Sequence, residues 1–156
     1  MNKKPAKPAK VPVHRAPPPQ QVRIIGGEWK RTPLPVLDAL GLRPTPDRVR
    51  ETVFNWINHL RGGDWNNATV LDLFAGSGAL GLEALSRGAA HCDFAEVSTA
   101  SLRAVRENAE LLGAGARATI HRADALRFVA GLGEEAYDLA FADPPYGHAL
   151  AAQVPD

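Results

Sequence analysis

The feature that most constrains the fold of this sequence is a regular alternation of short apolar runs and amphipathic segments, from residue 68 to residue 143. The apolar runs have the length of buried strands, and the segments between them have the periodicity of helices. Such alternation is typical of right-handed βαβ units, which build a parallel sheet with helices on both faces. We therefore expect an α/β fold with strands at 68–73, 91–96, 117–121 and 137–142 and helices at 79–87, 99–112 and 125–132.

Before this region the sequence predicts a short hairpin and a helix. The run V-R-I-I-G-G-E-W-K-R, residues 22–31, is typical of two strands joined by a two-residue turn at Gly26-Gly27. Thr45 and Pro46 then mark a helix start, as N-cap and first helical residue. We expect this helix to bury Val49, Val53, Trp56, Ile57 and Leu60 and to leave Arg48, Glu51 and Asn55 on another face.

Charge divides the chain into two unlike parts. Residues 1–61 hold twelve Lys and Arg against four Asp and Glu, whereas residues 62–156 hold six against thirteen. A basic part beside an acidic body suits a protein that binds a polyanion such as nucleic acid. Residues 1–20 are rich in Lys and Pro, so we expect a disordered basic tail before a single domain at 21–156. The tail could equally serve only to solvate the terminus.

Several classes of protein are disfavoured by composition. No stretch approaches eighteen apolar residues and no secretory signal is present, so we expect a cytoplasmic protein without a membrane partner. Cys92 is the only cysteine, which excludes an internal disulfide, and its apolar neighbours predict a buried thiol. No spacing of Cys and His predicts a metal site.

A glycine-rich loop, D-L-F-A-G-S-G-A-L-G at residues 72–81, follows the first strand of the alternating region. Its glycines allow close approach of a ligand, and the next helix points free N–H groups at the same place. A larger side chain at Gly78 is therefore expected to fill the loop. Glu96 lies twenty residues beyond Gly76, at the tip of the next strand, where an acid can bind ribose hydroxyls. Because the glycines also satisfy the dinucleotide fingerprint, the sequence is compatible with an NAD-dependent dehydrogenase too.

The presence of Asp72 in the loop indicates which kind of cofactor the loop binds. A carboxylate inside the loop would repel a pyrophosphate but suits a cofactor with an amine and a sulfonium, such as S-adenosylmethionine. D-L-F-A-G-S-G resembles the first motif of the class I methyltransferases, which implies their Rossmann-like sheet and S-adenosylmethionine as cofactor. The resemblance implies that Asp72 and the loop line the methionine end, Glu96 the ribose and Asp124 the adenine amine. The implied cofactor residues are Asp72, Phe74, Ala75, Gly76, Ser77, Gly78, Glu96, Asp124 and Ala125.

Both outer carboxylates could instead have a structural role. Asp124 directly precedes the helix that begins at Ala125 and could cap it. Glu96 could also cap the helix that follows it, although Ser98 or Thr99 would do so better.

The run D-P-P-Y-G, residues 143–147, ends the fourth strand of the alternating region. Two prolines stiffen it, and the Asp143 carboxylate and Pro144 carbonyl offer two acceptors that match the hydrogens of an exocyclic NH2 group. Accepting both would direct the nitrogen lone pair toward the sulfonium methyl, with Tyr146 stacked on a flipped-out base. The predicted catalytic set is Asp143, Pro144, Pro145 and Tyr146. The same run could also form only a tight turn with an exposed Tyr.

D-P-P-Y resembles the fourth motif of methyltransferases that act on adenine N6 or guanine N2. The hairpin sequence and the following G-L-R-P-T-P-D-R-V-R-E-T-V-F-N-W-I are similar to the RsmD family, which methylates guanine N2 in bacterial small-subunit ribosomal RNA during ribosome maturation. The resemblance runs from about Val22 to Gly147 and implies ribosomal RNA or a 30S assembly particle as partner. It also implies that Arg43, Arg48 and Arg50 lie at the RNA- and cofactor-facing edge, although each could instead lie on a solvated helix face.

The class I sheet has seven strands, of which the sequence predicts four. We therefore expect a domain incomplete at its C-terminus, with the fourth strand as an open edge prone to dimerisation or aggregation. The resemblance implies a monomer for a complete chain, and the sequence leaves the oligomeric state open. The sequence is also compatible with an adenine-N6 methyltransferase or with an inactive RNA-binding remnant.

Overall fold

The computed structural model describes residues 21–35, 45–133 and 136–143. Its centre is a parallel sheet in the order β5-β4-β3-β6. The strands are β3 (Thr69–Leu73), β4 (His91–Glu96), β5 (Ala118–Arg122) and β6 (Leu139–Ala142). The helices are α1 (Asp47–Leu60), α2 (Ala79–Ser86), α3 (Thr99–Leu112) and α4 (Ala125–Ala130), with a 3₁₀ turn at Gly115–Arg117. Each element of the alternating region thus lies within two residues of its expected bounds, and the α/β prediction is confirmed.

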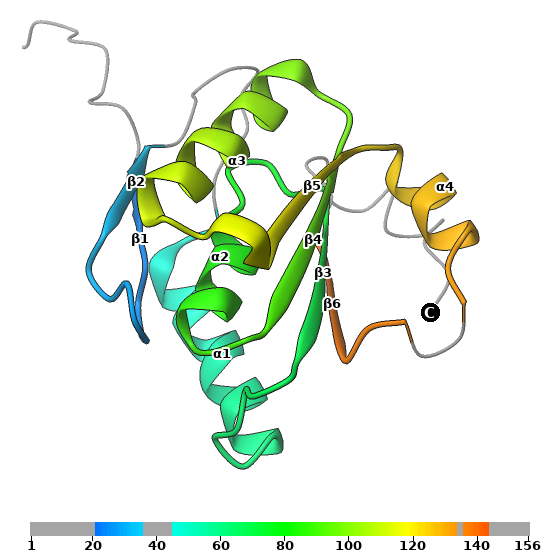
Figure 1. Ribbon diagram of the computed structural model, residues 1–156. Coiled ribbons are helices and arrows are strands. Elements are labelled where there is room, and N and C mark those ends of the chain that lie inside the picture. The colour runs from blue at the N-terminus through cyan, green and yellow to red at the C-terminus, as the bar shows by residue number, and fades with distance from the viewer. Residues whose placement is uncertain (1–20, 36–44, 134–135, 144–156) are drawn as a thin grey trace, which may run out of the picture.

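Helices cover both faces of the sheet, as expected. Helices α1, α2 and α3 lie on one face and α4 on the other (Figure 1). The larger core cluster, which includes Val70, Leu82, Phe94 and Val105, lies on the three-helix face. A smaller cluster of Leu71, Leu73, Ala95 and Ala125 lies under α4. Alternate residues of β3 and β4 therefore serve the two cores, as the pleat of a strand requires.

The strand order fixes where a ligand can bind. The chain runs from β3 outward through β4 to β5 and then returns to β6 on the other side of β3. Asp72 pairs in register with Phe94 on one side and with Phe141 on the other. The topological switch point therefore lies between β3 and β6, and open α/β sheets bind ligands at the carboxyl end of the strands beside such a point.

Helix α3 forms as its sequence predicts. Ser98 caps it by accepting a hydrogen bond from the Ser101 N–H at 3.3 Å, and Gly113 ends it with a φ of 69°. On the side of this helix that faces the sheet, Leu102, Val105 and Ala109 are buried, while Leu112 is partly buried against the same core. Cys92 is also fully buried, as expected.

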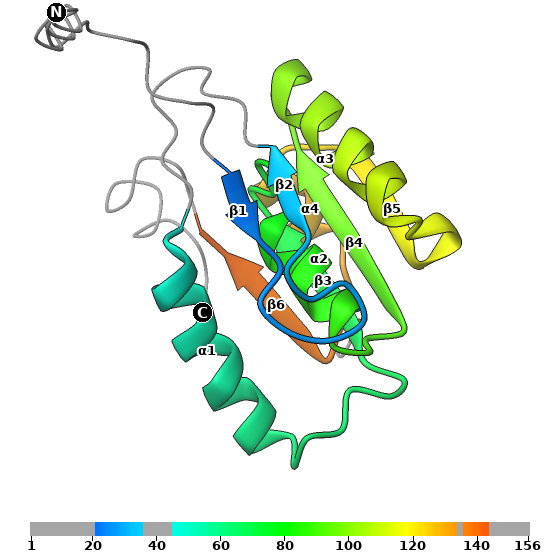
Figure 2. The same ribbon diagram turned by 90° about the vertical axis from the view of Figure 1, so that its left-hand side faces the viewer.

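The N-terminal hairpin is present, but its second strand differs from the prediction. Strand β1 (Gln21–Arg23) pairs antiparallel with β2 (Pro33–Pro35), so the connection spans residues 24–32 and is not a two-residue turn. Gly27, at φ 81°, lies so close to α2 that an added Cβ would overlap the Ser86 carbonyl. The Glu28 N–H donates to that carbonyl at 2.7 Å. The glycines therefore allow the hairpin to dock across α2, on the side away from the sheet (Figure 2).

Helix α1 differs from the prediction at both its start and its buried face. Pro46 is the N-cap residue, and no side chain caps the helix, so the expected cap by Thr45 is wrong. Val53 and Ile57 pack against the core as expected, but the fully buried residues are Arg50 and Phe54. The expected inward residues Val49, Trp56 and Leu60 are 48%, 69% and 83% exposed. The apolar surface of α1 is therefore wider than the part that the four-stranded sheet covers.

Candidate functional site

The glycine loop between β3 and α2 has an unusual backbone. Phe74, Gly76 and Gly78 all have positive φ angles, of 57°, 58° and 82°. For an aromatic residue this conformation is strained, and such strain is concentrated at ligand sites. The Phe74 ring packs against the smaller core cluster, which holds the loop at the carboxyl end of β3.

The three glycines of the motif have different surroundings. A Cβ added at Gly78 would lie 2.6 Å from Val105 Cγ2, and one at Gly81 would lie 2.7 Å from Cys92 Sγ. Both glycines therefore let α2 pack on the sheet, and the expectation that a side chain at Gly78 would fill the loop is wrong. At Gly76 the nearest atom is the Phe74 carbonyl oxygen, at 3.9 Å. Among the described residues, Gly76 is thus the glycine of the motif that faces open space.

Asp72 is a buried carboxyl group with little compensation. It is 1% exposed, and its only hydrogen bond among the described residues comes from the Gly81 N–H at 2.9 Å. The pKa of Asp72 is raised to about 8: burial is the largest cause, the Gly81 hydrogen bond opposes it, and the charges of Asp143 and Glu96 add to it. No cation among the described residues pairs with it. The site therefore fits a ligand that brings a positive charge to Asp72.

Glu96 borders the loop from the end of β4. Its Oε2 accepts a hydrogen bond from the Gly76 N–H at 3.0 Å, and its Oε1 accepts from the Val97 and Ser98 N–H groups. Glu96 therefore lies next to the glycine loop, as expected. Because Ser98 caps α3, the structure disfavours a capping role for Glu96.

Asp124 follows β5, one strand further from the switch point. It is exposed and caps α4, accepting a hydrogen bond from the Arg127 N–H at 3.1 Å. The neighbouring Ala123 N–H donates to the Glu96 carbonyl at 3.1 Å, which holds the two strand ends together. Asp124 therefore has the capping role that its sequence position allowed. Its other carboxylate oxygen has no partner among the described residues. The Ala125 side chain is buried in the smaller core.

Asp143 lies directly after β6, on the other side of the switch point from Glu96. Its carboxylate is exposed, and its Oδ2 accepts a hydrogen bond from the Thr45 hydroxyl at 2.7 Å. Asp143 follows the strand that pairs in register with the Asp72 strand, and its charge also raises the pKa of Asp72. Pro144, Pro145 and Tyr146 lie outside the described residues.

The three predicted RNA-binding arginines have different settings. Arg48 is exposed on α1, and Arg43 lies outside the described residues. Arg50 is 1% exposed, and its guanidinium forms ion pairs with Asp47 at 3.1 Å and Glu83 at 3.4 Å. The placement of Arg50 at an RNA-facing edge is therefore contradicted, because its charge is used inside the protein.

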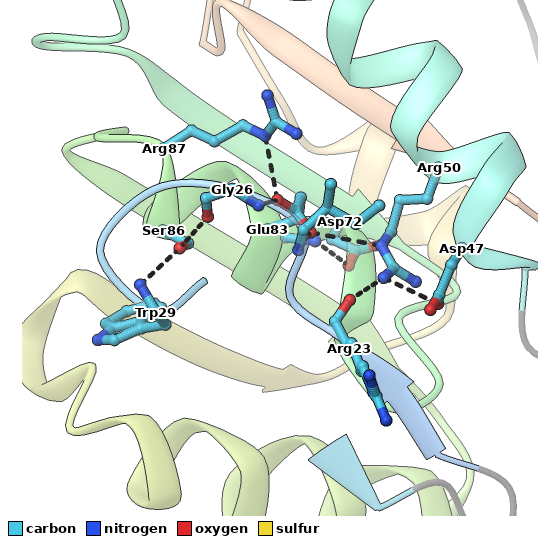
Figure 3. A network of polar contacts seen from close by, with 11 residues as sticks. Arg23, Gly26, Trp29, Asp47, Arg50, Asp72, Glu83, Ser86 and Arg87 are labelled. Atoms are coloured by element: carbon cyan, nitrogen blue, oxygen red, sulfur yellow. Dashed lines mark hydrogen bonds and ion pairs between the residues drawn. The ribbon is translucent and has the colours of Figure 1, made fainter. Parts of the chain in front are cut away.

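A buried network around Glu83 was not predicted from the sequence. Glu83 accepts hydrogen bonds from the N–H groups of Ile25 and Gly26 in the hairpin and from Arg50 and Arg87. Figure 3 shows Glu83 between these two arginines, with the Arg50 guanidinium also donating to the Arg23 carbonyl. The network fixes the hairpin and α1 to the helix that begins at the glycine loop. Its only sequence signal is an acid inside an otherwise apolar helix.

Asn108 also holds the loop and was not predicted. This buried residue of α3 donates from Nδ2 to the Ser77 carbonyl at 2.9 Å and to the Pro35 carbonyl at 3.3 Å. It therefore links the glycine loop to the end of β2. Among the described residues no cluster of three or more metal-ligating side chains occurs, and no helix there is long and apolar enough to cross a membrane.

The arrangement is the Rossmann-like fold of the class I methyltransferases, with an acidic site at the switch point. Comparisons of this chain with known proteins agree with that class. A family model described as Conserved hypothetical protein 95 matches residues 22–155. The ribosomal RNA small subunit methyltransferase D of Escherichia coli is 46% identical over 134 residues, covering 86% of this chain and 65% of the relative. That of Haemophilus influenzae is 39% identical, covering 86% and 68%. This chain belongs to the family of these proteins, the RsmD family.

A solved structure agrees with the sequence relatives. The crystal structure of a candidate methylase from Haemophilus influenzae has a TM-score of 0.68 to this chain, with 35% identity over 86% of this chain and 70% of that one. The chain spans about 65% of the length of the Escherichia coli relative that it matches.

Proposed function

We propose that this chain carries the cofactor site and the catalytic carboxylate of an S-adenosylmethionine-dependent methyltransferase. Its acceptor would be the exocyclic N2 amine of a guanine in small-subunit ribosomal RNA. The observation that carries the proposal is Asp72, a buried carboxyl group beneath the glycine loop with no cation of its own among the described residues. A cofactor with an ammonium and a sulfonium supplies the missing charge, whereas the pyrophosphate of NAD would add repulsion.

The names of the relatives support a ribosomal RNA substrate. The Escherichia coli and Haemophilus influenzae proteins are both called ribosomal RNA small subunit methyltransferase D. We propose the same class of substrate here, either as free RNA or within an assembling 30S particle in the cytoplasm. Exposed Arg48 and, by its sequence position, Arg43 would contact RNA phosphates.

The cofactor, when bound, supplies an electrophilic methyl group on a sulfonium. Asp72 would balance the positive charge of the cofactor. The open space at Gly76 would admit the part of the cofactor that lies against the loop backbone. Phe74, Ala75, Ser77 and Gly78 shape the loop, while the remaining lone pairs of Glu96 would accept from ribose hydroxyls. Asp124 and the Ala125 backbone would face the adenine.

Asp143 would orient the acceptor amine. Its carboxylate and the Pro144 carbonyl would each accept a hydrogen from the guanine NH2, which directs the nitrogen lone pair at the methyl carbon. The amine would take the methyl group in place of one of its hydrogens, and the Asp143 carboxylate or water would accept the proton that is released. Pro145 would stiffen this turn and Tyr146 would stack on a base that has been flipped out of its helix.

A transfer assay tests the proposal. The chain is incubated with small-subunit ribosomal RNA and cofactor labelled in its methyl group, and the RNA is then digested and its nucleosides separated. The expected product is N2-methylguanosine, and the Asp143→Ala chain is expected to bind the cofactor but form no product. Label in N6-methyladenosine would favour the adenine enzyme. Salt-dependent RNA binding without any cofactor binding would favour a non-catalytic RNA-binding protein.

A further inference from the structure

A side chain from the start of α1 contacts the proposed catalytic carboxylate. The Thr45 hydroxyl donates to Asp143 Oδ2 at 2.7 Å, although 98 positions separate the two residues. Thr45 lies at the start of α1 but does not cap it, since that helix has no side-chain cap. Its hydroxyl is thus directed at the end of β6 and not at its own helix.

The backbone at Thr45 is well suited to hold a side chain in place. Thr45 stands between Pro44 and Pro46 in the sequence. A residue before proline is kept out of the helical region, and Pro46 itself is extended, with φ −56° and ψ 146°. Threonine is also restricted at χ1 because it is β-branched. The hydroxyl therefore has few alternative positions.

We propose that Thr45 is a positioning residue for Asp143. The inference rests on the proposed function, in which Asp143 accepts a hydrogen of the guanine amine. An exposed aspartate at a strand end can rotate freely. The Thr45 hydroxyl engages Oδ2 and leaves Oδ1, which has no partner among the described residues, to accept from the substrate. One fixed carboxylate plane is what two-point recognition of a planar NH2 group requires.

The expected effect of losing this contact is on the transfer step. A small misplacement of a catalytic group costs roughly 10- to 100-fold in rate. Thr45→Val keeps the shape and the β-branch but removes the donor, so the single-turnover rate of methyl transfer is expected to fall about 10-fold or more. Thr45→Ser keeps the donor and is expected to restore most of the rate. The RNA concentration at half-maximal rate and the dissociation constant for S-adenosylhomocysteine are expected to stay unchanged in both.

Thr52 provides a matched control on the same helix. Its hydroxyl donates to the Arg48 carbonyl at 3.0 Å and not to the site, so Thr52→Val is expected to transfer at the wild-type rate. The 13C resonance of the Asp143 carboxyl carbon gives a readout that is independent of turnover. It is expected to shift in Thr45→Val and to stay unchanged in Thr52→Val.

Three results would overturn the inference. The first is a Thr45→Val chain that transfers at the wild-type rate. The second is a rate loss accompanied by a matching loss of cofactor affinity or of melting temperature, which would make Thr45 a structural residue. The third is a rate loss that Thr45→Ser does not restore. A wild-type chain that binds cofactor and RNA but transfers no methyl group would contradict the proposed function itself, and with it this inference.

Discussion

Asp72 and Glu83 are both buried carboxylates, yet the protein surrounds them in opposite ways. Glu83 is fully buried and accepts hydrogen bonds from Ile25 N–H at 2.8 Å, Gly26 N–H at 3.0 Å, Arg50 at 3.4 Å and Arg87 at 3.0 Å. Asp72 is 1% exposed and, within the described parts of the chain, accepts one hydrogen bond, from Gly81 N–H. The chain thus compensates the charge of Glu83 by itself and leaves that of Asp72 without a partner among the described residues.

The difference separates a structural group from a binding group. A buried carboxylate that two cations and two N–H groups satisfy needs nothing further, and its role is to hold elements together. A buried carboxyl group with a raised pKa and acidic neighbours costs stability unless a ligand compensates it, which is typical of functional sites. The two carboxyl groups are therefore expected to give opposite results when each charge is removed.

Removing the charge of Glu83 is expected to have the largest effect on folding. Glu83→Gln removes the buried carboxylate partner of the Arg50 guanidinium and leaves it only the half-exposed Asp47, and breaking such a buried pair costs about 3–5 kcal/mol. The free energy of unfolding, measured by denaturant titration, is expected to fall by this amount. Glu107→Gln on the exposed face of α3 is the control and is expected to stay within about 0.5 kcal/mol of the wild type. Equal stabilities of the two variants would mean that the Glu83 network holds nothing together.

Removing the charge of Asp72 is expected to act on binding and not on folding. Asp72→Asn keeps an acceptor for the Gly81 N–H but cannot balance a cation. The affinity for S-adenosylmethionine, measured by calorimetry, is expected to fall by about 2–5 kcal/mol, which is the cost of truncating a buried charge pair. The ligand-free variant is expected to be at least as stable as the wild type at pH 8. A destabilised Asp72→Asn chain with normal affinity would reverse the assigned roles.

The raised pKa of Asp72 predicts how stability depends on pH. Because the folded chain holds a proton on Asp72 up to about pH 8 while the unfolded chain releases it near the ordinary value of 3.8, stability is highest at low pH with respect to this group and falls as pH rises. Between pH 6 and pH 8 the free energy of unfolding is expected to fall by about 2 kcal/mol because of Asp72. The difference in unfolding free energy between wild type and Asp72→Asn isolates it. A difference that is independent of pH would contradict the raised pKa.

The smallest expected effects come from the acidic neighbours of Asp72. Asp143 and Glu96 both raise its pKa, Asp143 more than Glu96. Asp143→Asn is therefore expected to move the pH dependence of stability to lower pH by less than about one unit, and Glu96→Gln by less than that. Carboxyl 13C titration of Asp72 in each variant measures the shift. An unchanged titration in Asp143→Asn would mean that the two carboxyl groups do not share a site.

The sequence predicts the positions of the candidate carboxyl groups well where they stand at strand ends. Asp72, Glu96 and Asp143 follow from the alternation of strands and helices alone, because parallel strands bring their carboxyl ends to one edge. The glycine loop follows as well, but the directions of its glycines do not. Gly78 faces the core and Gly76 faces open space, which depends on how α2 packs against Phe94 and Val105.

The errors come from contacts between distant segments. Arginine is almost never buried without a partner, which favours the surface for Arg50, but its partner Glu83 lies in a different helix. Glu83 stands out locally only as an acid in an apolar helix, and its role depends on a hairpin 57 and 58 positions away that packs back on α2. The prediction for the buried face of α1 is wrong in part because the apolar stripe is wider than the sheet beneath it.

The most direct test of the central claim is a calorimetric titration of this chain with S-adenosylmethionine at about pH 7 in buffers of different ionisation enthalpy. A cation bound beside Asp72 lowers its pKa from about 8, so the wild type is expected to release close to one proton more per bound cofactor than Asp72→Asn, and to bind more tightly. Equal affinity and equal proton release in the two chains would contradict the claim that Asp72 is the carboxylate this cofactor neutralises.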